Sequence, residues 1–177
     1  MKKEKFLFIL AFILFAQLSY SQLIMIDGET GEYKYEDIVT VTGQSQQELL
    51  RRAKEWLELY YPESASVKIV ERSSYTRTGM YKFRWKLIQK DIPVTLFYDI
   101  DIKTKDNKYK YAFSNFREGK MYGNEIDANP LKVYVDRFPT RYQIYLEEPI
   151  DTEITKAISS LEYYILNGTV ENLDNDW

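Results

Sequence analysis

The sequence predicts an α+β two-layer sandwich, in which an antiparallel sheet carries two amphipathic helices on one face, in the order β-α-β-β-β-β-α. Three successive segments alternate apolar with polar side chains, as half-buried strands do, and two other segments repeat apolar residues at helical spacing. The alternation leaves the second sheet face polar and open to water. With 45% hydrophobic and 16% aromatic residues, the chain of 177 residues has the composition of a folded domain.

Residues 1–21 are expected to be a signal peptide that is removed on export. A basic start, Lys2–Lys5, precedes an uninterrupted apolar run, Phe6–Ala16. As a helix this run would be about 16 Å long, much shorter than the roughly 30 Å hydrocarbon core, so a membrane anchor is the weaker alternative. We expect cleavage between Ser21 and Gln22, and the absence of cysteine excludes a lipid-anchored N-terminus.

The expected mature chain is acidic. Removal of residues 1–21 takes away three lysines and one glutamate, which changes the formal net charge from −3 to −5. Proteins that bind nucleic acid or anionic lipid electrostatically carry a positive surface, so neither is expected as a partner. We expect a periplasmic or secreted protein with no integral membrane anchor after cleavage.

The missing residue types exclude much of enzyme chemistry. The chain has no histidine, which is the commonest general base and transition-metal ligand, and no cysteine. The sequence contains no recognisable nucleophile elbow, phosphate loop or metalloprotease spacing. We therefore expect no catalytic residue, no metal and no cofactor.

A single domain is expected over residues 34–167, between a short leader, residues 22–33, and a frayed acidic tail, residues 168–177. The first strand is predicted at Tyr35–Thr42, a segment rich in β-branched residues. Residues 118–148 are interpreted as mostly loop. Short strands at 132–135 and 142–146 are the alternative there.

Two helices are predicted from apolar periodicity. The first begins at a capping box, Ser45–Glu48, and ends before Pro62. The second runs from about Pro149 to Leu166 and ends at Gly168.

Four strands are predicted between the helices, with two-residue turns at Lys90-Asp91 and Asp106-Asn107. Trp56 of the first helix and Trp85 of the sheet should be buried on facing surfaces. The second turn should set Ile100 opposite an inward-facing aromatic residue, Phe113. The four predicted strands are Val67–Ser73, Tyr81–Leu87, Leu96–Ile102 and Tyr109–Phe113.

Several segments together carry a family resemblance: Ser21 with Gln22, Glu48–Leu57, Tyr98–Asp101, Lys108–Phe116 and Ile154–Leu166. On these residues the chain resembles a secreted family common in Bacteroidota, domain-of-unknown-function family 4468 (DUF4468). The resemblance covers residues 35–116 and, loosely, the last helix. It implies a fold like that of the TATA-binding protein (TBP-like) and brings no assigned activity or catalytic residue. Such a fold does not itself imply DNA binding, because function lies in sites and not in folds.

Asp99 and Asp101 are the candidate carboxylate pair. They stand on one strand face with Cα atoms about 6.7 Å apart, and Lys82 is expected directly opposite Asp99. Cross-strand charge pairing on a solvated face is the favoured interpretation. The alternatives are a divalent-metal site, or acid–base catalysis of the kind that inverting glycosidases perform, with Glu147 or Glu148 nearby.

The alternation places most aromatic side chains in the core, with Phe97 and Phe116 as exceptions on the wet face. There they would lie among Arg84, Lys86 and Lys110, either as local cation–π contacts or as the centre of a binding patch. Together with Lys82 and Lys108, these side chains would form a basic strip. The candidate binding face consists of Lys82, Arg84, Lys86, Phe97, Asp99, Asp101, Lys110 and Phe116.

The favoured function is an exported, non-enzymatic interaction module of the bacterial envelope, whose partner is an envelope protein or a glycan. The alternative is a protein that binds a glycan or small ligand, or a hydrolase, using Asp99 and Asp101. A deep pocket would favour the alternative, and a flat or shallow sheet would favour the module.

Overall fold

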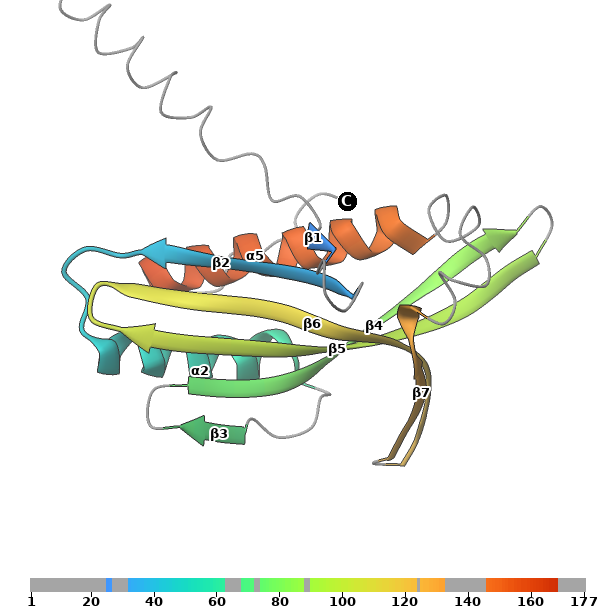
Figure 1. The fold of residues 1–177 in the computed structure, drawn as a ribbon, viewed down its shortest axis with the longest axis horizontal. Helices are drawn as coiled ribbons and strands as arrows, with labels where there is room; N and C mark the ends of the chain where they lie inside the picture. The colour runs from blue at the N-terminus through green and yellow to red at the C-terminus, as the bar shows by residue number, and fades with distance from the viewer. Residues whose placement is uncertain are drawn as a thin grey trace, which may run out of the picture.

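The computed structural model describes residues 25–26, 32–62, 68–71, 74–87, 90–123, 125–132 and 146–168. These residues form an antiparallel sheet and two long helices (Figure 1). The α+β sandwich predicted from the sequence is confirmed. The predicted signal peptide, residues 1–21, lies outside the described residues, as does most of the predicted tail.

The sheet has the strand order β1-β2-β6-β5-β4-β3, and β7 pairs with the far end of β6. The predicted leader contributes β1, which pairs with the start of β2. The strands are β1 Met25–Ile26, β2 Tyr33–Thr40, β3 Lys68–Glu71, β4 Ser74–Leu87, β5 Lys90–Lys105, β6 Lys108–Tyr122 and β7 Glu125–Pro130.

Helix α2, Gln46–Tyr60, begins where the capping signal predicts. The Ser45 hydroxyl accepts a hydrogen bond from the Glu48 amide at 3.2 Å, which satisfies one of the unpaired amides of the first turn. The Glu48 carboxylate accepts hydrogen bonds from the guanidinium groups of Arg51 and Arg52. The helix ends before Pro62, as predicted.

Helix α5, Glu148–Asn167, also matches its prediction. Pro149 lies in the first turn, and Gly168 caps the C-terminus with a φ of 73°, a left-handed conformation that favours glycine. The predicted apolar stripe is fully buried: Ile150, Ile154, Ala157, Ile158, Leu161, Tyr164 and Ile165.

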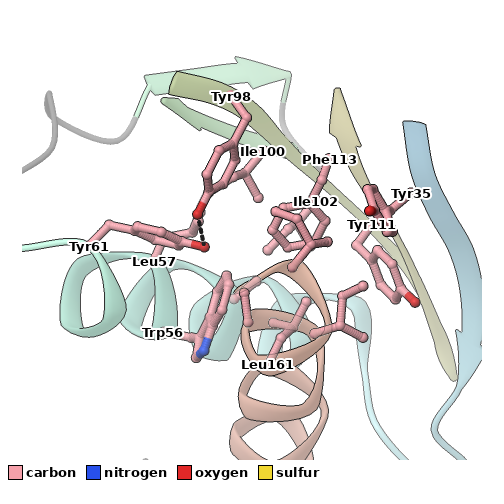
Figure 2. Packing of buried hydrophobic residues seen from close by; sticks show 14 of the residues in the cluster. Tyr35, Trp56, Leu57, Tyr61, Tyr98, Ile100, Ile102, Tyr111, Phe113 and Leu161 are labelled. Carbon is pink, nitrogen blue, oxygen red and sulfur yellow. Dashed lines mark hydrogen bonds between the residues drawn. The ribbon is translucent and has the colours of Figure 1, made fainter. Parts of the chain in front are cut away.

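The core lies between the sheet and both helices, which cover the same face (Figure 2). Trp56 on α2 has no exposed surface, and its indole nitrogen donates to the Ser160 hydroxyl of α5 at 3.1 Å. This hydrogen bond joins the two helices inside the core. The side chain of Trp85, the other predicted core tryptophan, lies outside the described residues.

One predicted hairpin register is correct and the other is wrong. Between β5 and β6, Ile100 pairs with Phe113 across the Asp106-Asn107 turn, as predicted. Between β4 and β5, Lys90 already pairs with Leu87, so the expected turn at Lys90-Asp91 belongs to the strand. The polar pair carries local turn propensity, but long-range strand pairing overrides it. Because the resulting shift is an even number of residues, each strand keeps its predicted inner and outer faces.

Much of the segment predicted as loop, residues 118–148, continues the sheet. Strand β6 extends to Tyr122 and turns into β7, and this hairpin leaves the body of the sheet in a different direction from the β4–β5 hairpin (Figure 1). Gly119 pairs with Ala128 of β7, and a Cβ at this position would clash with the Asp127 carbonyl oxygen, so the close approach of the two strands requires glycine. The short strands expected as the alternative, at 132–135 and 142–146, lie almost entirely in residues 133–145, outside the described part of the chain.

Candidate interaction surface on the open sheet face

The outer face of the sheet, opposite the helices, is where the sequence predicts the candidate binding face. On β5 the even-numbered residues from Leu96 to Thr104 are buried, and on β6 Tyr109, Tyr111 and Phe113 are buried. The intervening residues therefore point outward. Asp99 and Asp101 share this face, as the sequence predicts.

Asp99 is held by three neighbouring side chains. Its Oδ1 accepts from Arg117 at 2.8 Å and from the Thr78 hydroxyl at 3.2 Å, and its Oδ2 accepts from the Asn115 amide at 2.6 Å. The expected partner, Lys82, instead stands opposite Thr95 in the observed register. Both carboxylate oxygens are thus committed to structural hydrogen bonds, which suits neither a metal ligand nor a general base.

The Asp99 contacts fix an irregularity in β6. The β5–β6 register shifts between Phe97 and Asp99, and Asn115 has a φ of 52°. Such a β-bulge inserts one residue and reverses the facing of the strand beyond it. As a result Phe116 turns inward.

The two aromatic residues expected on the wet face are both buried, which corrects that prediction. Phe116 is 5% exposed and packs in the core against Tyr35 and Tyr98, with ring centroids 5.9 and 5.6 Å away. The bulge explains its inversion, because simple alternation along β6 would put it outside. Phe97 keeps its outward facing but is only 1% exposed and stands outside the main core cluster. Neither ring is available to a partner.

The predicted basic strip is only partly present. Lys82 is exposed, whereas the side chains of Arg84 and Lys86 lie outside the described residues. Lys110 is half-buried and pairs with Glu36 of β2 at 2.8 Å. Glu36 also pairs with Lys34 at 2.8 Å, and the two ammonium groups lower the pKa of its carboxyl.

A different basic cluster lies at the end of the sheet near the β5–β6 turn. Lys105 stands directly opposite Lys108, and Lys103 stands directly opposite Lys110, all on the outer face. We call these four residues the lysine quartet. Lys108 and Lys110 belong to the basic strip expected from the sequence, whereas Lys103 and Lys105 do not. The correctly predicted turn register already implied their pairing.

The turn that carries the quartet is tied to the loop before α2. Asn107 accepts from the Val41 amide at 2.8 Å and donates its own amide to the Gln44 carbonyl at 2.8 Å. Its side-chain oxygen accepts from Gly43 at 2.7 Å, and Asp106 accepts from the Gln46 amide at 2.8 Å. These long-range bonds hold the backbone beneath the lysines in one conformation.

A second polar cluster lies at the edge of the core. The hydroxyls of Tyr98 and Tyr61 are hydrogen bonded at 3.2 Å (Figure 2), and the Tyr98 hydroxyl donates to Glu153 of α5 at 3.4 Å. Burial raises the pKa of the Glu153 carboxyl, against a smaller lowering by Lys156. The hydroxyl of Tyr98 gives this half-buried carboxylate a hydrogen-bond donor.

The described residues offer little support for a ligand or metal site. They contain no group of three or more acidic side chains placed to hold a metal ion. Glu147 and Glu148 lie at the start of α5, an element apart from Asp99 and Asp101. A hollow beside Phe116 and Leu131 encloses about 10 Å³, which is close to the space that one water needs. Neither of the two described helices is long and apolar enough to cross a membrane.

The model of the family described as "domain of unknown function (DUF4468) with TBP-like fold" matches residues 35–118. This stretch of the chain is similar to the DUF4468 family. The match confirms the resemblance expected from the sequence and extends just past the bulge, to the residues that hold Asp99. The family description carries no activity.

Two solved structures are similar to this chain. A TBP-like protein from Parabacteroides distasonis ATCC 8503 has a TM-score of 0.52 and 13% identity, over 77% of this chain and 97% of that chain. A DUF4468 family protein from Bacteroides ovatus ATCC 8483 has a TM-score of 0.46 and 12% identity, over 58% of this chain and 64% of that chain, less than two thirds of its length. The first likeness shows the fold alone. A search of curated proteins found no match.

Proposed function

We propose that this protein is an exported, non-enzymatic interaction module of the bacterial envelope, which binds its partner through the open sheet face. The observation that carries the proposal is the state of Asp99. Its two oxygens accept three hydrogen bonds from neighbouring side chains, so the best candidate for chemistry on this face is a structural residue.

Export is part of the same proposal. A basic start and an apolar run of signal-peptide length precede the domain. The bacterial envelope is the destination that such a segment specifies. The hydrolase and ligand-binding alternative loses its main support, because Asp99, the residue on which it depended, is held by three neighbouring side chains.

Tagging the protein at its C-terminus in its native host tests the proposal. We expect the tagged chain in the envelope fraction or the medium, with a specific partner retained after cross-linking. A chain that stays in the cytoplasm, or that is recovered from the envelope without any specific partner, would contradict the proposed function.

A further inference from the structure

We propose that the lysine quartet is the contact surface of the module and that it binds an acidic surface patch on a partner protein. The quartet is Lys103, Lys105, Lys108 and Lys110, with Ile38 beside it. This inference rests on the proposed function and names the partner chemistry of the same face.

The arrangement of the lysines is unfavourable in the free protein. Like charges directly opposite each other on neighbouring strands destabilise a sheet, and the quartet contains two such pairs in succession. Of the nearby carboxylates, Glu36 is shared between Lys110 and Lys34, and Asp106 accepts the Gln46 amide. The positive charge of the quartet is therefore only partly balanced within the described part of the chain. A partner with negative charge would remove the repulsion.

An apolar side chain adjoins the charges. Ile38 of β2 pairs with Lys110 in register, faces the same side and is 59% exposed. One row across three strands thus reads Lys103, Lys110 and Ile38. Apolar contacts flanked by charged ones are typical of protein interfaces, which bury an apolar centre inside a polar rim.

A protein fits the surface better than a long polyanion does. The quartet contains lysines and no arginine, so it presents separate point charges and lacks the planar fork that suits phosphate and sulfate groups. Asp101 lies two residues before Lys103 on the same face, Asp99 lies beyond it, and the whole chain is negatively charged. A glycan or nucleic acid that extends past the quartet would meet this negative charge, whereas a compact acidic patch would not.

The backbone under the quartet is organised before binding. The Asp106-Asn107 turn is bonded to the loop before α2 by Asn107 and Asp106. Little backbone entropy is then lost when a partner docks, which favours binding. The lysine side chains alone need to adjust.

Titration of isotopically labelled protein with defined probes tests the inference by NMR. The probe is a glutamate-rich peptide with a central leucine, and its controls are the same peptide with glutamine for glutamate, and heparin. We expect the glutamate peptide to shift the amide signals of Lys103–Lys110 and Ile38. The shifts should weaken as ionic strength rises from about 0.05 to about 0.3 M, because screening shortens the Debye length.

Matched variants separate the quartet from general charge. The double variant Lys103→Gln/Lys105→Gln should raise the Kd of the glutamate peptide about tenfold, which corresponds to about 1.4 kcal/mol. The double variant Lys120→Gln/Lys156→Gln removes the same charge from exposed lysines elsewhere and should leave the Kd within about twofold. Ile38→Ser should weaken the peptide and leave heparin unchanged.

Several results would overturn the inference. Equal weakening by both double variants would mean that only net charge matters. Stronger binding of heparin than of the glutamate peptide to the quartet amides would assign the surface to a sulfated glycan. A native-host partner retained fully by Lys103→Gln/Lys105→Gln would reject the quartet and leave the proposed function standing. Absence of any envelope partner would reject the proposed function, whatever the peptide does in vitro.

Discussion

At the scale of single residues, Asp99 shows how the same pattern can suggest chemistry and serve structure. A pair of carboxylates on one strand face is compatible with metal binding or acid–base catalysis. In this domain one member of the pair accepts hydrogen bonds from Thr78, Asn115 and Arg117, and these bonds span β4, β5 and β6. The carboxylate joins three strands at the place where β6 is irregular.

Asp99→Ala should therefore destabilise the fold. The change leaves the half-buried Arg117 guanidinium and the Asn115 amide without their acceptor, and we expect a loss of about 2 kcal/mol in the free energy of unfolding. Asp101→Ala on the same strand face is the matched control and should change it by less than about 0.5 kcal/mol. Urea denaturation measures both. Equal losses for the two variants would show that the network does not act as described.

Glu153 provides a test through pH. Burial raises the pKa of its carboxyl above the ordinary value of 4.5, so between these values the folded state binds more protons than the unfolded state. The stability contributed by this group is thus lost as pH rises from 4.5 through the folded pKa. Tyr60, Tyr61, Tyr81, Tyr98 and Lys156 are the titratable groups that influence it or lie beside it.

Glu153→Gln removes this titration and keeps an acceptor for Tyr98. The stability of the variant relative to the parent should increase as pH rises from about 4 to about 7, because only the parent must then bury a charge. Urea unfolding at several pH values gives the difference directly. A difference that stays constant or shrinks over this range would contradict the assignment.

Gly79 shows a constraint of another kind. It pairs with Tyr98, and a Cβ at position 79 would lie 2.5 Å from the tyrosine ring. The ring therefore lies across the glycine and could not do so with any larger residue there. The sequence contains the glycine and the tyrosine, but the wrong β4–β5 register concealed that they are neighbours.

At the scale of elements, the two helices show which features of a helix terminus the sequence can predict. Both N-termini and the Gly168 cap follow local rules and were predicted. Neither helix has a basic residue in its last turn, yet the carbonyls of both C-termini accept from arginines of other elements. Arg77 of β4 donates to Leu57 and Tyr61, and Arg52 of α2 donates to Ile165 and Leu166. These long-range caps have no local signal.

The β5–β6 hairpin carries the next prediction. Lys105→Glu replaces a like-charged pair with an opposite-charged pair against Lys108 and should raise the free energy of unfolding by about 0.5 kcal/mol. Lys120→Glu is the mirror control, because Lys120 stands opposite Asp127 and the change creates a like-charged pair. It should lower the free energy of unfolding slightly. Thermal unfolding at low salt measures both, and a lower midpoint for Lys105→Glu would refute the repulsion.

Local alternation along a strand predicts facing only while the strand stays regular. Up to Phe113 it is correct, because every residue of β6 adds one step of the pleat. Asn115 is an extra residue in β6 with no counterpart in β5. Beyond it, each side chain of β6 points to the face opposite to the one that alternation predicts, and Phe116 is therefore predicted on the wrong face. The bulge depends on hydrogen bonds to Asp99, sixteen residues earlier in the chain. Apolar–polar alternation along one strand cannot indicate a contact with a residue of another strand.

At the scale of the whole molecule, the two-layer architecture was predictable because it follows from apolar periodicity alone. The packing of both helices on one sheet face requires only that each element bury its apolar side. The candidate surface was less predictable. It depends on two registers and one bulge, and only the β5–β6 register was right. The lysine quartet follows from that register. The prediction for Phe116 fails because of the bulge, and the prediction for Phe97 fails because its outward-facing ring is buried outside the main core cluster.

Cleavage of the N-terminal segment, residues 1–21, is a prediction that concerns the whole chain. Intact-mass spectrometry of protein isolated from its native host should give a chain that begins at Gln22, because Ser19 and Ser21 are small residues at the positions that a signal peptidase inspects. Replacing Ser19 and Ser21 with bulky residues should block this cleavage and serves as the control. A mature protein that still begins at Met1 would exclude the signal peptide.

The bulge in β6 has a consequence for engineering. It separates the strand into a segment that contributes to the core and a segment that leads into the β6–β7 hairpin, with Asp99 and Asn115 as the joint. The hairpin beyond the joint is mostly exposed, so its sequence is under weak packing constraint. Foreign hairpins could be grafted there onto an unchanged scaffold, provided that the graft begins after Arg117 and retains the joint. The same domain could then display many different loops.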